Sequence, residues 1–126
     1  MMKLFEKGNT GSIETKNRIF MAPMGMGTAT DIDGGISQRI IDYYTERAKG
    51  GFGVIFTAAN LAIDKYESRS GNMLNEFQHV ERLHMLANNV HSYGSKLVVQ
   101  ISAVLGRMGL SDPYTPRRAP SEMQSF

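Results

Sequence analysis

Three short, continuously apolar segments alternate with two longer amphipathic segments along this chain. The apolar segments, which we predict to be strands, are 18–22, 53–59 and 96–101. Unbroken apolar runs are typical of strands in a parallel sheet that is covered by helices. Between them, the segments from Ser37 to Lys49 and from Glu76 to Tyr93 repeat apolar residues at helical spacing. This order predicts an α/β fold built from right-handed βαβ units.

Local signals set the expected boundaries and faces of these elements. Ser37 is a good helix N-cap, and Lys49 is followed by two glycines that end the first helix. The turn residues between 4 and 17 predict a small hairpin or cap before the first strand. Polar loops are expected at 63–75 and beyond residue 102. The expected buried positions are Ile40, Ile41, Tyr44 and Ala48 in the first helix, and Phe77, Val80, Leu83, Ala87 and Val90 in the second.

Two architectures can be built from such units, an open doubly wound sheet and a (β/α)8 barrel. A complete barrel needs about 250 residues, and this chain has 126. In both architectures ligands bind at the carboxyl ends of the strands. The candidate site therefore lies after residues 22, 59 and 101.

The first of these strand ends, APMGMG, has an unusual composition. Pro23 and the glycines Gly25 and Gly27 flank the large, soft side chains of Met24 and Met26. Backbone with few side chains suits the close approach of a flat apolar group. At the third strand end, Gln100 carries an amide that can both donate and accept hydrogen bonds. The alternative for Gln100 is a structural residue bonded to a neighbouring loop.

Other motifs carry weaker signals. GMGTAT lacks the third glycine of a dinucleotide fingerprint, and DIDGG places its residues wrongly for a calcium loop, so we expect a solvated turn there. The three histidines, His79, His84 and His91, lack the helical spacing of metal pairs and are expected on the solvent side. We assign no metal site and no catalytic residue.

Composition excludes several classes of function. The chain has no cysteine, which rules out a disulfide framework or an iron–sulfur cluster held by these residues. Its net charge of +2, with basic residues scattered, does not favour a nucleic-acid partner. The N-terminal region lacks a long apolar stretch, so we expect no membrane partner and a cytoplasmic location.

Four motifs in this order carry a family resemblance: NRIFMAPMGMG, DYYTERAKGGFGVIFTAA, VVQISAVLGR and RRAPSEM. They resemble the Old Yellow Enzyme family, the NADH:flavin oxidoreductase class of FMN-dependent barrels. The forms APMG and Q-x-S-A-x-x-G-R are closest to the branch of the 2,4-dienoyl-CoA reductases. The resemblance covers nearly the whole chain. It implies that residues 1–126 are the N-terminal part of one FMN-binding TIM-barrel domain, namely a short hairpin and the first three βα units.

The resemblance also implies positions for the flavin. Pro23, Met24 and Gly25 would lie against the isoalloxazine ring, Ala59 beside it, and Gln100 on its pyrimidine edge. Ala58 takes the place of a glutamate in the family pattern. The proton donor and the phosphate site of the family come from later strands.

The implied function is transfer of a hydride from NAD(P)H through FMN to the activated C=C bond of a small enoate or enoyl-type substrate. In this branch a 4Fe-4S cluster and FAD belong to the later part of the polypeptide, and a homo-oligomer of the complete protein is expected. One alternative is a truncated, non-catalytic product that acts as a structural or assembly partner of a second chain. Another is a small stand-alone flavin-binding domain, against which the missing phosphate site argues.

Overall fold

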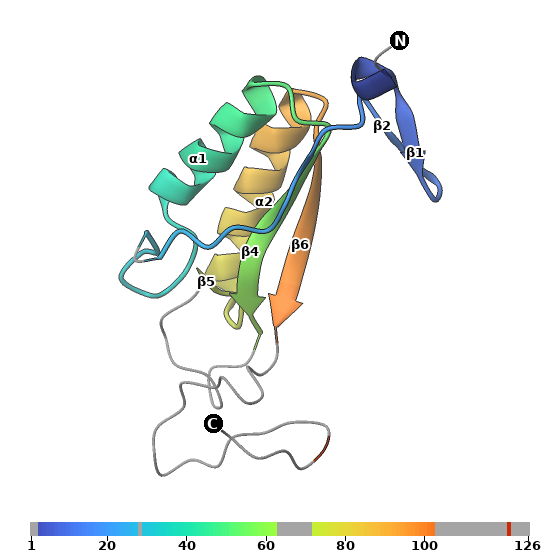
Figure 1. Cartoon of the computed structure of the whole chain (residues 1–126). Coiled ribbons are helices and arrows are strands. Elements are labelled where there is room, and N and C mark those ends of the chain that lie inside the picture. Colours follow the sequence, from blue (N-terminus) through green and yellow to red (C-terminus); the bar gives the residue numbers. More distant parts are fainter. Residues whose placement is uncertain (1–2, 28, 63–71, 103–120, 122–126) are drawn as a thin grey trace.

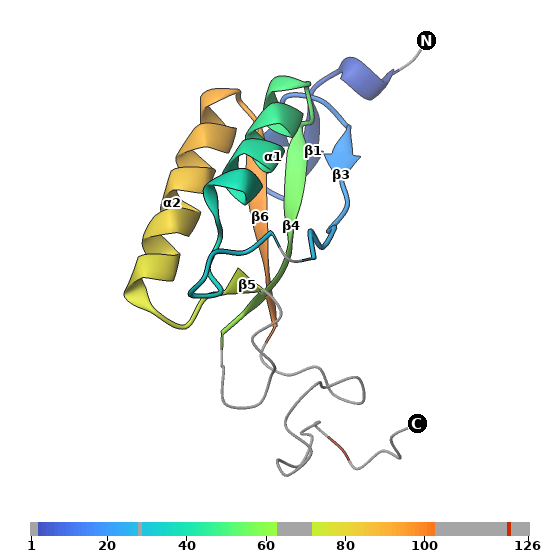
Figure 2. The ribbon, with the colours of Figure 1, turned by 90° about the vertical axis from the view of Figure 1, so that its left-hand side faces the viewer.

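The computed structural model describes residues 3–27, 29–62, 72–102 and 121, and shows a parallel sheet with two helices on one face (Figures 1 and 2). In the sheet, β4 pairs in parallel with β3 on one side and with β6 on the other. The predicted βαβαβ order is therefore confirmed. The elements are β3 (Phe20–Met21), α1 (Gln38–Lys49), β4 (Val54–Leu61), α2 (Phe77–Ser92) and β6 (Lys96–Ser102). A helix after β6 would fall outside the described residues.

The predicted N-terminal hairpin is also confirmed. After a short 3-10 helix, η1 (Lys3–Phe5), strands β1 (Gly8–Thr10) and β2 (Ile13–Thr15) pair antiparallel. Gly11, in the turn between them, has a φ of +58°, a conformation that glycine adopts without steric penalty. The hairpin stands apart from the two helices, close to the N-terminus (Figure 1).

Helix α1 follows its sequence signals closely. The Ser37 side chain accepts the Ile40 N–H at 3.4 Å, and the Gly50 N–H donates to the Glu46 carbonyl at 2.8 Å. Gly51 then turns the chain away with a φ of +107°. All four residues predicted to face inward are buried: Ile40, Ile41, Tyr44 and Ala48.

The predicted buried face of α2 is partly wrong. Val90 is buried as expected, but Phe77 and Val80 are exposed. The buried positions are His79, Leu86 and Val90, and Leu83 is partly buried against the core, so the inner face is rotated from the predicted one. The apolar residues Phe77 and Val80 lie on an exposed flank of α2.

A short strand was missed in the predicted loop 63–75. Strand β5 (Asn72–Met73) pairs in parallel with Asn60 and Leu61 at the end of β4. It pairs with the same edge of β4 as β3 does, but β3 pairs near the start of β4 and β5 near its end. A strand this short carries no periodic signal, so the sequence could not reveal it.

The start of β4 approaches the chain before β3 very closely. A Cβ on Gly53 would lie 2.6 Å from the Asn17 carbonyl oxygen, which leaves no room for a side chain. The Asn17 amide donates to the Gly51 carbonyl at 2.6 Å, and its oxygen accepts the Ile19 N–H at 3.1 Å. These contacts fix the entry of β3 into the sheet.

The two faces of the sheet differ in exposure. Met21 and Ile55 lie in the core beneath the helices, together with Leu86 and Val90. Side chains alternate along a strand, so Phe20 points to the other face, where it is 44% exposed. Both helices lie on the same side of the sheet (Figure 2), and the opposite face therefore carries exposed apolar side chains.

Candidate functional site

The carboxyl ends of β3, β4 and β6 meet at one edge of the sheet and bring most of the predicted site together. Ala59 on β4 is paired with Gln100 on β6. The segment after β3 is linked to the same edge through a hydrogen bond from the Tyr44 hydroxyl to the Met24 carbonyl. Met24 is 55% exposed, and Pro23 and Gly25 are exposed as well. These residues form the candidate site.

The two glycines of APMGMG lack side chains for different reasons. Gly27 has a φ of +58°, so the turn itself requires glycine. Gly25 has no positive φ, and a Cβ placed on it would meet no described atom within 4 Å. Neither local conformation nor packing within the described residues explains the glycine at position 25. Open space beside its backbone is what a closely approaching ligand needs.

Gln100 presents a free amide at this edge. Its side chain is exposed and makes no hydrogen bond to any residue that the structure describes, whereas its backbone is held on both sides. The alternative, in which the side chain bonds a neighbouring loop, finds no support among the described residues. The amide can offer a donor and an acceptor to a ligand at the same time.

A β-bulge lies beneath the candidate site. The pairing of β4 with β6 shifts register between Phe56 and Ala59, so β4 carries one extra residue there. The buried hydroxyl of Thr57 accepts the Gln100 N–H at 3.1 Å. The buried amide nitrogen of Asn60 lies 2.8 Å from the Thr57 hydroxyl and 3.1 Å from the Gln100 carbonyl. Thr57 and Asn60 therefore fix the backbone of the site, and the buried Asn60 Oδ1 has no hydrogen-bond partner among the described residues.

Tyr44 on α1 is the residue of this site that sequence reasoning placed only in the core. It is 1% exposed, and its hydroxyl accepts the Ala58 N–H at 2.9 Å and donates to the Met24 carbonyl at 3.4 Å. Burial raises the pKa of the phenol, while the Ala58 N–H lowers it. A tyrosine on a predicted buried face is itself a signal, because a buried hydroxyl needs a polar partner.

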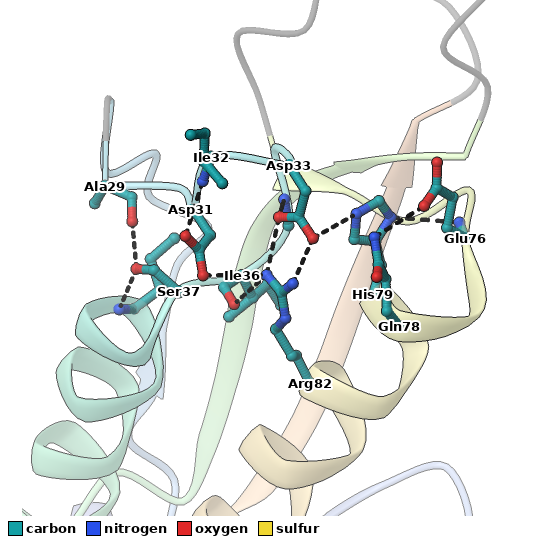
Figure 3. A network of polar contacts seen from close by, with 12 residues as sticks. Ala29, Asp31, Ile32, Asp33, Ile36, Ser37, Glu76, Gln78, His79 and Arg82 are labelled. Carbon is teal, nitrogen blue, oxygen red and sulfur yellow. Dashed lines mark hydrogen bonds and ion pairs between the residues drawn. The ribbon is translucent and has the colours of Figure 1, made fainter.

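A second polar cluster joins the loop after β3 to the start of α2 (Figure 3). Arg82 pairs with the Asp33 carboxylate through its two terminal guanidinium nitrogens: Nη1 lies 2.9 Å from Oδ1, and Nη2 bonds Oδ2. The Gly35 N–H donates to the same carboxylate at 2.9 Å. The Arg82 hydrogen bond, with help from Gly35, lowers the pKa of Asp33 from 3.8 to about 2.

His79 belongs to this cluster, contrary to its predicted place in solvent. It is 2% exposed, its Nδ1 accepts the Glu76 N–H at 3.3 Å, and its Nε2 lies 3.5 Å from Asp33 Oδ2. A Cβ on Gly35 would come within 2.6 Å of the His79 ring, so this glycine makes room for it. The predicted solvated turn is therefore only partly correct: Asp31 and Ile32 are exposed, whereas Gly34 and Gly35 are buried at a packed junction. His84 and His91 are exposed as predicted.

This junction has the character of a structural clamp. Asp33 is already occupied by Arg82 and Gly35. Among the described residues no group of three or more potential ligands is arranged to hold a metal ion. The prediction that the chain holds no metal depends also on residues outside the described ranges and stays a prediction.

A hollow of about 360 Å³ lies at the other end of the molecule. It is bordered by the hairpin and β3, at the amino end of the sheet, and not at the strand ends where α/β folds bind ligands. We therefore do not treat it as the candidate site. Its lining residues are Gly8, Asn9, Thr10, Thr15, Arg18 and Phe20.

Parallel strands with covering helices define a protein of the α/β class, in which the carboxyl ends of the strands are the usual place for a ligand. Residues 3–125 match the model of the NADH:flavin oxidoreductase / NADH oxidase family. The chain belongs to this family, whose members are FMN-dependent enzymes that use NADH or NADPH. The resemblance to the Old Yellow Enzymes is thereby confirmed.

Similar proteins agree with this assignment. The cinnamate reductase of Clostridium sporogenes is 34% identical over 112 residues, which are 85% of this chain and 17% of that protein. A 2-naphthoyl-CoA reductase structure with bound 2-naphthoyl-CoA is 28% identical with a TM-score of 0.75, over 85% of this chain and 16% of its own. The structure of the Old Yellow Enzyme of Pichia sp. AKU4542 is 26% identical with a TM-score of 0.75, and the match covers 85% of this chain and 28% of that one.

Proposed function

We propose that this chain is the N-terminal, flavin-ring-binding part of an FMN-dependent ene-reductase. The complete protein would transfer a hydride from NAD(P)H through FMN to the activated C=C bond of an enoate or enoyl-type substrate. Two observations carry the proposal in a chain of this family: the glycine at position 25, which no described contact explains, and the Gln100 amide, which has no hydrogen-bond partner among the described residues. The names of two relatives, a cinnamate reductase and a 2-naphthoyl-CoA reductase, support the substrate class.

The residues present fit a flavin ring. Pro23, Met24 and Gly25 would supply a backbone surface against the ring, and the small side chain of Ala59 leaves space beside it. Gln100 would bond the pyrimidine edge, where a carbonyl and an N–H stand next to each other. When bound, FMN supplies the hydride chemistry, and the protein positions the ring and tunes its electronics. The family's glutamate is replaced here by Ala58, which removes one charge from the vicinity of the ring.

The proposal includes a longer polypeptide that completes a (β/α)8 barrel, of which residues 1–126 contribute the hairpin and the first βα units. The chain spans only 17% of the cinnamate reductase it matches. Phe20 and Val98 are 44% and 36% exposed on the face of the sheet that would form the barrel interior. The remaining strands would cover these side chains and supply the phosphate site and the proton donor.

Membership of the dienoyl-CoA reductase branch is a further part of the proposal. It adds a 4Fe-4S cluster and FAD to the later part of the polypeptide, which iron and flavin analysis of the complete protein would test. A homo-oligomer and a cytoplasmic location stay predictions. No helix in the described ranges is long and apolar enough to cross a membrane.

The first test is the mass of the native product in its source cell, detected with an antibody against α2. We expect a band several times heavier than 14.0 kDa, a flavin absorption spectrum and reduction of an enoate by NAD(P)H. A native product of 14.0 kDa would contradict the barrel. It would favour the alternative, an assembly partner that pairs with a second chain through sheet edges that no described strand covers.

A further inference from the structure

Residues 23–27 and β4 are joined by one buried hydroxyl. The Tyr44 Oη donates to the Met24 carbonyl at 3.4 Å and accepts the Ala58 N–H at 2.9 Å. Tyr44 is 1% exposed, so water does not compete for these bonds. The hydroxyl therefore contacts the backbone of both segments that would flank the flavin ring.

The other described hydrogen bonds of residues 23–27 do not hold the backbone of this segment against the rest of the fold. Among the described residues, Met26 accepts a local bond from the Ala29 N–H at 3.3 Å, and the Met24 sulfur accepts one from the Tyr43 hydroxyl at 3.5 Å. Neither ties the backbone of 23–27 to another element. Of the residues that the structure describes, only Tyr44 does so, and the Gly25 N–H has no partner among them.

The helix that carries Tyr44 is fixed at both ends. Ser37 caps its start, and Gly50 closes its end with a hydrogen bond to Glu46 at 2.8 Å. The Tyr44 ring packs in the core with Ile40, Ile41 and Ile55. The hydroxyl is therefore held at one place and cannot follow a displacement of the segment after β3.

We propose that Tyr44 is a positioning residue of the flavin site, whose hydroxyl sets the separation between the Met24–Gly25 backbone and the Ala58–Ala59 backbone. This inference rests on the proposed function. Tyr44 would act on the ring through these two backbone segments and not by touching it. Its removal would let the Met24–Gly25 peptide shift, so that the ring loses its fitted backbone surface while the fold is retained.

The test compares three variants of the complete polypeptide that carries this chain. Tyr44→Phe removes only the hydroxyl. Tyr43→Phe removes the neighbouring hydroxyl, which reaches the Met24 side chain only, and keeps the ring on which Arg47 stacks at 3.4 Å. Ile41→Val trims the same core without touching a polar group. The measurements are the FMN dissociation constant and the flavin absorption spectrum, both well below the melting temperature.

We expect Tyr44→Phe to weaken FMN binding about tenfold, the factor that corresponds to the loss of one buried hydrogen bond, and to shift the flavin absorption. Tyr43→Phe and Ile41→Val should keep the wild-type constant and spectrum. A merely structural role would lower the melting temperature of Tyr44→Phe and leave FMN binding to the folded protein unchanged, which would overturn the inference.

Two further outcomes are distinguishable. If wild-type protein binds no FMN, the proposed function fails and this inference falls with it. If Tyr44→Phe does not fold, a ring-fluorinated tyrosine at position 44 keeps the hydroxyl but makes it a stronger donor and a weaker acceptor. A shifted flavin spectrum in that protein would support the inference, and an unchanged spectrum would contradict it.

Discussion

Gly25 and Gly27 stand two residues apart, and each lacks a side chain for a different reason. At Gly27 the φ of +58° requires glycine, whereas at Gly25 the backbone is ordinary and the space is open. The glycine at position 27 serves the fold, and we propose that the glycine at position 25 serves a ligand. This difference is visible only in the structure, because the two glycines look alike in the sequence.

Alanine at each position separates the two roles. Gly27→Ala should lower the free energy of unfolding by roughly 1–2 kcal/mol, the steric penalty of a left-handed residue with a Cβ. Gly25→Ala should leave stability unchanged and weaken FMN binding by about tenfold or more, because the methyl group enters the space of the ring. On the complete polypeptide, urea unfolding measures the free energy of unfolding and flavin titration measures the FMN affinity. A loss of stability without loss of FMN affinity in Gly25→Ala would refute the ligand role.

Asp33 predicts a pH dependence. Its pKa falls from 3.8 to about 2 because Arg82 bonds the carboxylate. The folded state therefore binds the proton less tightly than the unfolded state, so the pair contributes stability above pH 3.8. That contribution is lost as the pH falls toward about 2.

The measurement is urea unfolding of wild type and Asp33→Asn at several pH values between 3.8 and about 2. The stability difference between the two proteins should shrink as the pH falls. Asp42→Asn serves as a control, because Asp42 is exposed on α1 and bonded to the neutral Gln38 at 2.7 Å. A difference between wild type and Asp33→Asn that does not change with pH would contradict the clamp.

At the scale of elements, the sequence predicted the features that periodic apolar residues and helix-capping residues determine locally. The face, start and end of α1 were correct because Ser37, Gly50 and the inward residues act locally. The face of α2 was assigned only partly correctly: Val90 is buried as predicted, but Phe77 and Val80 are exposed, and the polar His79 is buried against Asp33. Strand β5 and the Tyr44 bridge depend on contacts between distant segments, and no local pattern records them.

The bulge in β4 gives a prediction at this scale. Thr57→Val keeps the side-chain shape but removes the hydroxyl that accepts the Gln100 N–H at 3.1 Å. A buried donor without a partner costs about 1–3 kcal/mol, so the free energy of unfolding should fall by that amount. Thr57→Ser keeps the hydroxyl and should retain most of the stability. Equal losses in the two variants would show that the methyl group matters and not the hydrogen bond.

At the scale of the whole molecule, the predicted parallel α/β architecture is confirmed by the structure and the family by the comparisons. The flavin positions Pro23, Met24, Gly25, Ala59 and Gln100 stay predictions. The structure brings their strand ends to one edge of the sheet, as the rule for parallel sheets requires. Residues 103–120 and 122–126, which carry parts of two of the family motifs, lie outside the described ranges.

The exposed face of the sheet predicts how residues 1–126 behave when they are produced alone. Phe20 and Val98 are exposed there, and β6 has only β4 as a described partner. Exposed apolar faces and open strand edges promote association. We expect aggregation and strong binding of a hydrophobic dye, both reduced by Val98→Lys. A stable monomer that does not bind the dye would contradict the incomplete barrel.

The most direct test of the flavin site is FMN binding by the complete polypeptide, as wild type and as Gln100→Leu. The Gln100 side chain makes no hydrogen bond to the described residues, so leucine should not destabilise the fold. We expect one FMN per wild-type chain and an affinity about tenfold or more lower in the variant. Wild-type protein without flavin, or a variant that binds FMN as tightly as wild type, would contradict this expectation.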